Sequence, residues 1–92
     1  MRIKVNPIGV IEGMIKEREF YLPGERISLE NFYMFLVDRY DANLKEHLLP
    51  HGSLSSQYFI LINGRNSKLL GGLKTELKDG DSILICPILT GG

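Results

Sequence analysis

The sequence of 92 residues has one cysteine, no net charge and no long hydrophobic run. Cys86 alone cannot form an internal disulfide, and the N-terminus lacks the apolar run of a signal peptide, so we expect a cytoplasmic protein. Eleven Lys and Arg balance eleven Asp and Glu, which excludes the basic field that holds a nucleic-acid backbone. No apolar stretch approaches the roughly 20 residues that span a bilayer. We therefore expect neither nucleic acid nor a membrane as a partner.

The length of the chain allows one domain with a single modest core. Hydrophobic residues make up 43% of the chain and charged residues 24%, which is typical of a globular protein and too apolar for a disordered one. A chain of this size has no room for a substrate cleft between two lobes. A self-contained enzyme is therefore not the expected class.

Local patterns predict several strands and one main helix. Ile3 and Val5 alternate with polar residues, which is typical of a strand with one buried face. Ser28 is a favourable N-cap for a helix over residues 29–40, where apolar residues recur at helical spacing. Further strands are expected at residues 19–22, 58–62, 68–70 and 82–87, with turns at Asn63-Gly64 and Asp79-Gly80-Asp81. This order indicates an α+β sheet with one helix packed across it.

Two segments leave the arrangement of the molecule open. Residues 9–16, between the first two strands, are expected to form a long, mobile loop, and residues 41–57 are polar with one candidate helical turn. Strands 58–62 and 82–87 lack polar alternation, so each presents apolar side chains on both faces, although one helix covers only one face. The opposite face is either a docking patch or covered by residues 41–57.

The last quarter of the chain carries the most specific pattern. The turn Leu77-Lys78-Asp79-Gly80-Asp81 precedes the apolar run Ile83-Leu84-Ile85-Cys86-Pro87, which leads into Thr90-Gly91-Gly92. With the opening strands and the capped helix, this pattern resembles the MoaD/ThiS family of ubiquitin-like β-grasp sulfur carriers over nearly the whole chain. The resemblance implies a β-grasp domain at residues 1–87, with a mixed sheet and one main helix on one face. It also implies a flexible, extended Gly-Gly tail at residues 88–92.

The resemblance assigns the chemistry to that tail. In the family, an E1-like enzyme uses ATP to adenylate the C-terminal glycine carboxylate, and a sulfur donor converts it to a thiocarboxylate. Gly92 is therefore the expected working residue, and glycine at Gly91 lets the backbone approach the nucleotide closely. Ile88, Leu89 and Thr90 would line the partner's channel. The chain is expected to be a carrier rather than an enzyme, to bind no cofactor itself, and to meet a larger synthase subunit or an acceptor protein.

Three functions remain compatible with the sequence. Sulfur carriage for cofactor synthesis leads, and the small subunit of a molybdopterin synthase is favoured over a thiamine-type carrier because the chain is not minimal in length. A ubiquitin-like modifier would instead pass the activated glycine to a lysine amine of another protein. A non-covalent ubiquitin-like binding module would use its sheet face and never activate Gly92.

Other reactive side chains have simpler explanations. Cys86 lies in an apolar run without a histidine nearby in sequence, so a buried structural thiol is expected. His47 and His51 have the i, i+4 spacing of a metal pair, but Pro50 stands between them and no third ligand is evident. We therefore expect solvated loop histidines and no metal site.

Overall fold

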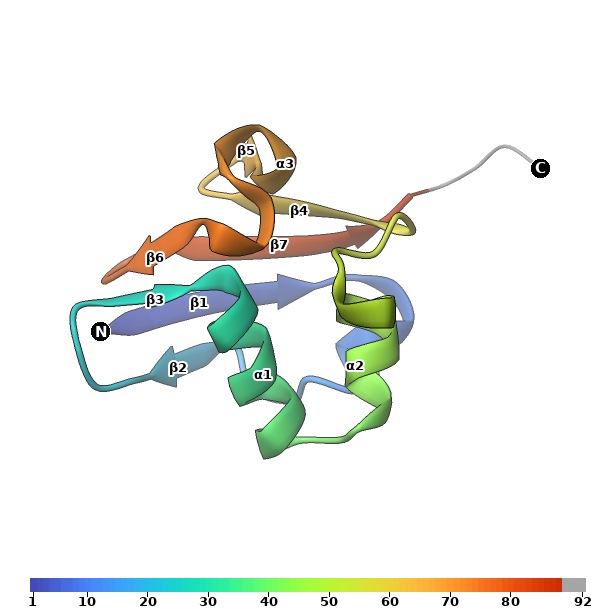
Figure 1. The fold of residues 1–92 in the computed structure, drawn as a ribbon. Helices are drawn as coiled ribbons and strands as arrows, with labels where there is room; N and C mark the ends of the chain where they lie inside the picture. Colours follow the sequence, from blue (N-terminus) through green and yellow to red (C-terminus); the bar gives the residue numbers. More distant parts are fainter. Residues whose placement is uncertain (89–92) are drawn as a thin grey trace.

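A mixed sheet of five strands in the order β2-β1-β7-β4-β5 forms the centre of the fold (Figure 1). The computed structural model describes residues 1–88. Strands β1 and β7 are parallel, the other neighbours are antiparallel, and β3 and β6 form a separate two-stranded sheet. The strands are β1 Arg2–Pro7, β2 Glu19–Tyr21, β3 Arg26–Ser28, β4 Tyr58–Ile62, β5 Arg65–Asn66, β6 Glu76–Lys78 and β7 Ser82–Pro87. The helices are α1 Leu29–Arg39, α2 Asn43–Leu48 and α3 Ser67–Leu70, with 3-10 turns η1 Gly9–Gly13, η2 Pro50–Gly52 and η3 Gly72–Lys74.

The main helix, α1, forms where the sequence predicts it. The hydroxyl of Ser28 accepts a hydrogen bond from the backbone N–H of Asn31 at 3.1 Å, and a cap of this kind stabilises a helix by about 1 kcal/mol. Leu29, Phe32 and Leu36 recur at helical spacing and are fully buried. This apolar stripe faces the sheet, so α1 is the main helix that the fold class requires.

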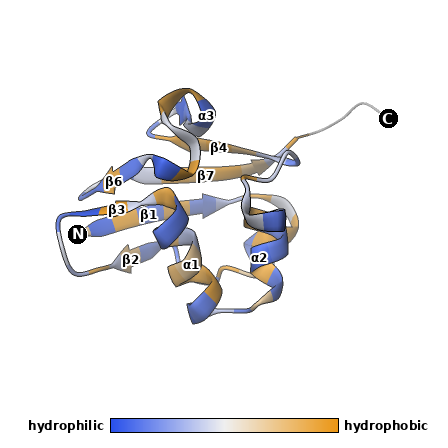
Figure 2. Ribbon diagram, in the orientation of Figure 1, coloured by the Kyte–Doolittle hydropathy of each residue, from blue (hydrophilic) through white to orange (hydrophobic). Residues whose placement is uncertain are grey.

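One buried cluster fills the space between the sheet and the helices. Ile3 and Val5 of β1 and Ile83 and Ile85 of β7 point into it and are completely covered. Helix α2 lies beside α1 and adds Leu48 to the same cluster (Figure 1). Hydrophilic and hydrophobic residues alternate around both helices, as an amphipathic packing face requires (Figure 2). Both helices therefore cover the same face of the sheet.

The prediction of a mobile loop at residues 9–16 is wrong. The chain forms the 3-10 turn η1 there, and the side chains of Ile11 and Ile15 are completely buried. The backbone N–H of Ile15 donates to the carbonyl of Ile11 at 3.1 Å. Ile11 and Ile15, four residues apart, therefore anchor this connection in the core. The segment is too short to show a periodic apolar pattern in the sequence.

The expected strand at residues 68–70 is also wrong. β5 begins directly after the two-residue turn Asn63-Gly64, as a tight hairpin requires, and residues 68–70 belong to α3. The side chain of Asn66 caps α3 by accepting from the N–H of Lys68 at 3.0 Å. Strands β3 and β6 were missed because three residues are too few to show an alternating pattern.

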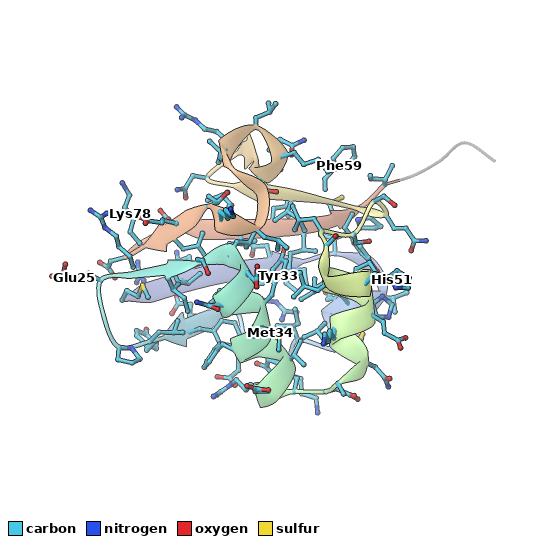
Figure 3. The ribbon with its side chains drawn as sticks, in the orientation of Figure 1. Glu25, Tyr33, Met34, His51, Phe59 and Lys78 are labelled. Atoms are coloured by element: carbon cyan, nitrogen blue, oxygen red, sulfur yellow. The ribbon has the colours of Figure 1, made fainter. Side chains whose placement is uncertain are left out.

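Tyr33 on α1 generates a test of the core. Its side chain is fully buried between α1 and the sheet (Figure 3), and its hydroxyl has no hydrogen-bond partner among residues 1–88. Burial raises the pKa of Tyr33 far above the usual range, because the phenolate would be charged in an apolar environment. The unfolded chain therefore releases this proton above about pH 10 while the folded chain retains it, so stability falls as the pH rises further.

We expect Tyr33→Phe to raise the free energy of unfolding at neutral pH by up to about 1 kcal/mol, because it removes an unsatisfied donor. The variant should also lose less stability than the native chain as the pH rises above about 10. Burial raises the pKa of Tyr58 as well, so Tyr58 accounts for part of the loss that remains. Urea unfolding at neutral and alkaline pH measures both effects. Tyr21→Phe, at an exposed position, is the matched control. A strong destabilisation by Tyr33→Phe would contradict an unpartnered hydroxyl.

Candidate functional site

The central strand β7 carries the chain toward the predicted tail. It is hydrogen-bonded on both edges, to β1 on one side and to β4 on the other. Ile88 continues this ladder, because its N–H donates to the carbonyl of Gln57 at 2.8 Å, and its side chain is half-buried. The other predicted tail residues, Leu89, Thr90, Gly91 and Gly92, lie outside the described residues. Ile88, the first residue of the predicted tail, is thus held by a backbone hydrogen bond to the residue that precedes β4.

Exposed apolar side chains lie beside the end of β7. Val10 in η1 is 73% exposed, and Ile8 just before it is also exposed. Gly9 between them has a φ of +88°, and a Cβ there would lie 3.1 Å from Cγ of Pro87, so the turn requires glycine. This close approach places the exposed side chains of Ile8 and Val10 next to the point at which β7 ends.

The sheet face opposite α1 stays open. Phe59 and Leu61 of β4 alternate with buried residues and therefore point away from the core. Phe59 lies across from Cys86 of β7, and Leu61 lies across from Leu84. Phe59 is 44% exposed, and the other three residues are half-buried. We call these four residues the open-face patch.

The position of residues 41–57 shows whether they cover the open-face patch. Helix α2, within residues 41–57, joins the buried cluster on the α1 side, where the ring of His47 contacts Tyr58. It therefore does not cover the patch. On the same open face, Lys4 of β1 lies across from Ser82, and Asn6 lies across from Leu84. Residues 41–57 therefore leave Phe59 exposed, with polar residues beside the patch, and its use for docking stays a prediction.

The turn before β7 is held by carboxylates with structural roles. Asp81 is only 5% exposed, and its carboxylate accepts from the side-chain N–H of Asn63 at 2.8 Å and the backbone N–H of Lys78 at 2.9 Å. Asp79 accepts from the N–H of Arg2 at 2.8 Å. These bonds tie the start of β7 to β1 and to the β4–β5 turn. They fix the position of the strand, so both carboxylates have a structural role.

The other reactive side chains lie apart from one another. Cys86 is half-buried on the open face, so the prediction of a buried thiol is wrong, because an apolar run does not show which side chains face the core. His47 lies on α2 rather than in a loop, and its Nδ1 is 3.0 Å from the hydroxyl of Tyr58, whereas His51 is exposed. Residues 1–88 contain no group of three His, Cys, Asp or Glu side chains arranged to hold a metal. None of the helices in that range has the length and apolarity to cross a membrane.

A one-sided β-grasp body whose central strand leads into a Gly-Gly terminus defines a ubiquitin-like carrier domain. The model of the ThiS family matches residues 15–92, and the chain belongs to this family of sulfur carriers. A protein of Archaeoglobus fulgidus that bears the name of a sulfur carrier is 29% identical over 92 residues, which is the whole of both chains. Membership of the family makes the chain a carrier rather than an enzyme.

Solved structures confirm the β-grasp fold. The solution structure of small archaeal modifier protein 1 from Methanosarcina acetivorans has a TM-score of 0.76 at 33% identity, covering 99% of this chain and 96% of that one. A chain of the Amycolatopsis orientalis BexX/CysO complex has a TM-score of 0.79 at 23% identity, covering 98% of this chain and 99% of that one. The similarity to the second structure shows the fold alone.

The position of Cys86 generates a test of the open face. We expect the thiol of the native protein to react with a small thiol reagent such as iodoacetamide, at a rate reduced by no more than about tenfold from that of the unfolded chain, because the residue is half-buried. Mass spectrometry of timed samples measures the rate. Cys86→Ser is the control for reaction elsewhere. A native thiol that stays unmodified while the unfolded chain reacts fully would show that the face is covered.

Proposed function

We propose that an E1-like enzyme adenylates the carboxylate of Gly92 and that a sulfur donor converts it to a thiocarboxylate for cofactor synthesis. The carboxylate oxygen bonds to the α-phosphorus of ATP and releases pyrophosphate, and sulfur then displaces AMP from the acyl carbon. The chain supplies the carboxylate, and its partners supply the catalysis. The observation that carries the proposal is the fixed central strand β7, which leads into a Gly-Gly sequence within the ThiS family match.

The body and the tail have separate tasks in this proposal. Residues 1–87 form the domain, and residues 88–92 act as the segment that enters the partner. Because Ile88 is bonded to Gln57, the four residues beyond it reach at most about 14 Å when extended. Leu89 and Thr90 would line the partner's channel with Ile88 at its entrance. The activating enzyme must therefore contact the body while it holds Gly92.

The open-face patch is the surface that we assign to this contact. Its apolar side chains lie on β4 and β7, so the patch and the tail share one strand. An exposed apolar patch with polar neighbours is typical of a protein-binding surface. The partners that we propose are the activating enzyme, a sulfur donor and the larger subunit of a molybdopterin synthase. A thiamine-type pathway is the second choice. A reducing cytoplasm suits the free thiol of Cys86.

Conjugation to lysine amines is the second candidate. The observation that favours it is the 33% identity to a protein named as a small archaeal modifier. Both candidates need the same activated Gly92, and they differ only in whether sulfur or an amine attacks the acyl carbon. A non-covalent binding module, by contrast, would need only the open face.

The reaction at the terminal carboxylate can be tested by mass spectrometry. After incubation with an E1-like activating enzyme, ATP and a sulfur donor, the intact mass of the untagged chain should rise by the exchange of one oxygen for sulfur. A chain without Gly91 and Gly92 should not change in mass, because it lacks the terminal glycine. A C-terminal extension should abolish the change, and an N-terminal extension should leave it intact. Failure with several activating enzymes would favour the binding module, and a lysine adduct would favour the modifier.

The contribution of the open-face patch to binding of the activating enzyme can be tested by substitution of Phe59. Phe59→Asp should raise the KM of the activating enzyme for this chain at least tenfold and leave kcat nearly unchanged, because it affects docking rather than the carboxylate. Met34→Asp is the matched control, since Met34 lies on the outer side of α1, away from Phe59 (Figure 3). Adenylation rates measured by pyrophosphate release give both constants. Equal effects of the two substitutions would contradict docking through the patch.

A further inference from the structure

Strand β2 is an edge of the sheet with free backbone groups. Paired hydrogen bonds join Leu22 to Met1 at 2.7 and 2.9 Å, and the N–H of Val5 donates to the carbonyl of Arg18 at 2.9 Å. Residues 18, 20 and 22 therefore bond to β1, and the backbone groups of Glu19 and Tyr21 point outward. Among residues 1–88, none of these outward N–H and C=O groups has a hydrogen-bond partner. They are the groups that an added β-strand requires.

A hollow of about 210 Å³ lies beside this edge, between β2 and α1. Phe20 of β2 forms its apolar floor, with the ring of Phe35 from α1 at 5.9 Å in an edge-to-face arrangement. The guanidinium of Arg39 lies 5.9 Å from the centre of the Phe20 ring and is held there by Glu17. The hollow is thus apolar at its floor and closed by an ion pair at one end.

We propose that the edge of β2 binds an extended peptide segment of another protein as an antiparallel strand. Two pairs of backbone hydrogen bonds would form, one at Glu19 and one at Tyr21. The peptide residue opposite Phe20 would lie on the same face as Phe20, because side chains directly across an antiparallel pair share a face. That residue points into the hollow, which fits one aliphatic side chain such as isoleucine.

The neighbouring peptide residues lie on the open face of the sheet. The residue opposite Glu19 would meet its carboxylate, to which the hydroxyl of Tyr21 donates at 3.3 Å. Lys4 lies across from Glu19 on β1, and within the described range Glu19 forms no ion pair. A lysine of the peptide is therefore complementary at this position. Opposite the ring of Tyr21, which is 72% exposed, a β-branched residue gives a favourable cross-strand pair.

This surface is separate from the tail and from the open-face patch. Strand β2 is at one end of the strand order, and β7 lies two strands away from it. In Figure 1, β1 lies between β2 and β7. A protein bound at β2 would therefore leave the end of β7 accessible. The site would hold the carrier on a second protein while Gly92 reacts with the first.

The test uses a blocked peptide of sequence Ser-Thr-Val-Ile-Lys-Thr-Ser, with its isoleucine placed opposite Phe20. Titration of nitrogen-15-labelled protein should give saturable shifts of the amide signals of Glu19 and Tyr21. Methylation of the valine and lysine backbone nitrogens removes the two donors that face β2, so binding should weaken at least about tenfold. Methylation of the isoleucine nitrogen, which faces away from β2, should change the affinity by less than about twofold.

A matched pair of protein variants tests the same edge. Tyr21→Pro removes the outward N–H and should weaken binding of the unmethylated peptide at least tenfold, while Tyr21→Val keeps it and should bind nearly as the native chain does. Deletion of Gly91 and Gly92 should leave peptide binding unchanged, whereas it abolishes the proposed sulfur loading. Absence of saturable shifts, shifts confined to other strands, or equal effects of the two methylation patterns would overturn the proposal. The peptide result does not depend on either variant being well folded.

Discussion

The parallel pairing of β1 with β7 organises the whole domain. It joins the first strand of the chain to the last, with Val5 beside Ile83 and Pro7 beside Ile85. The segments between β1 and β7 in the sequence must therefore either pack on a face of the sheet or add strands at its edges. The completely buried isoleucines of β7 lie on the face that both helices cover. The same pairing fixes where the chain leaves the domain. The position at which β7 ends is therefore a consequence of the core.

Packing of both helices on one face has a functional result. A small domain can bury only part of its surface, and here the covered face takes α1 and α2 while the other face keeps exposed apolar side chains such as Phe59. Such a face would be a liability in a protein that acts alone, because exposed apolar patches promote association. Under the proposed function, this face would contact the partners of the carrier.

The carrier also illustrates how a short sheet can present several independent surfaces. The central strands carry the open-face patch and the end of β7, and the edge strand β2 carries free backbone groups beside an aromatic hollow. These surfaces differ in chemistry, because one offers side chains and the other offers backbone donors and acceptors. Partners of different kinds can therefore contact the domain without competing for the same atoms.

Three features follow from strong local signals in the sequence: the capped helix after Ser28, the alternating first strand, and the apolar last strand that precedes the Gly-Gly sequence. Periodicity and capping are local, so they can be read without the fold. The burial of Ile11 and Ile15 and the outward orientation of Cys86 became evident from the three-dimensional packing alone. The same packing placed α2 beside α1. These features depend on contacts between residues that are far apart in the sequence. The apolar character of a residue does not show which neighbour will cover it.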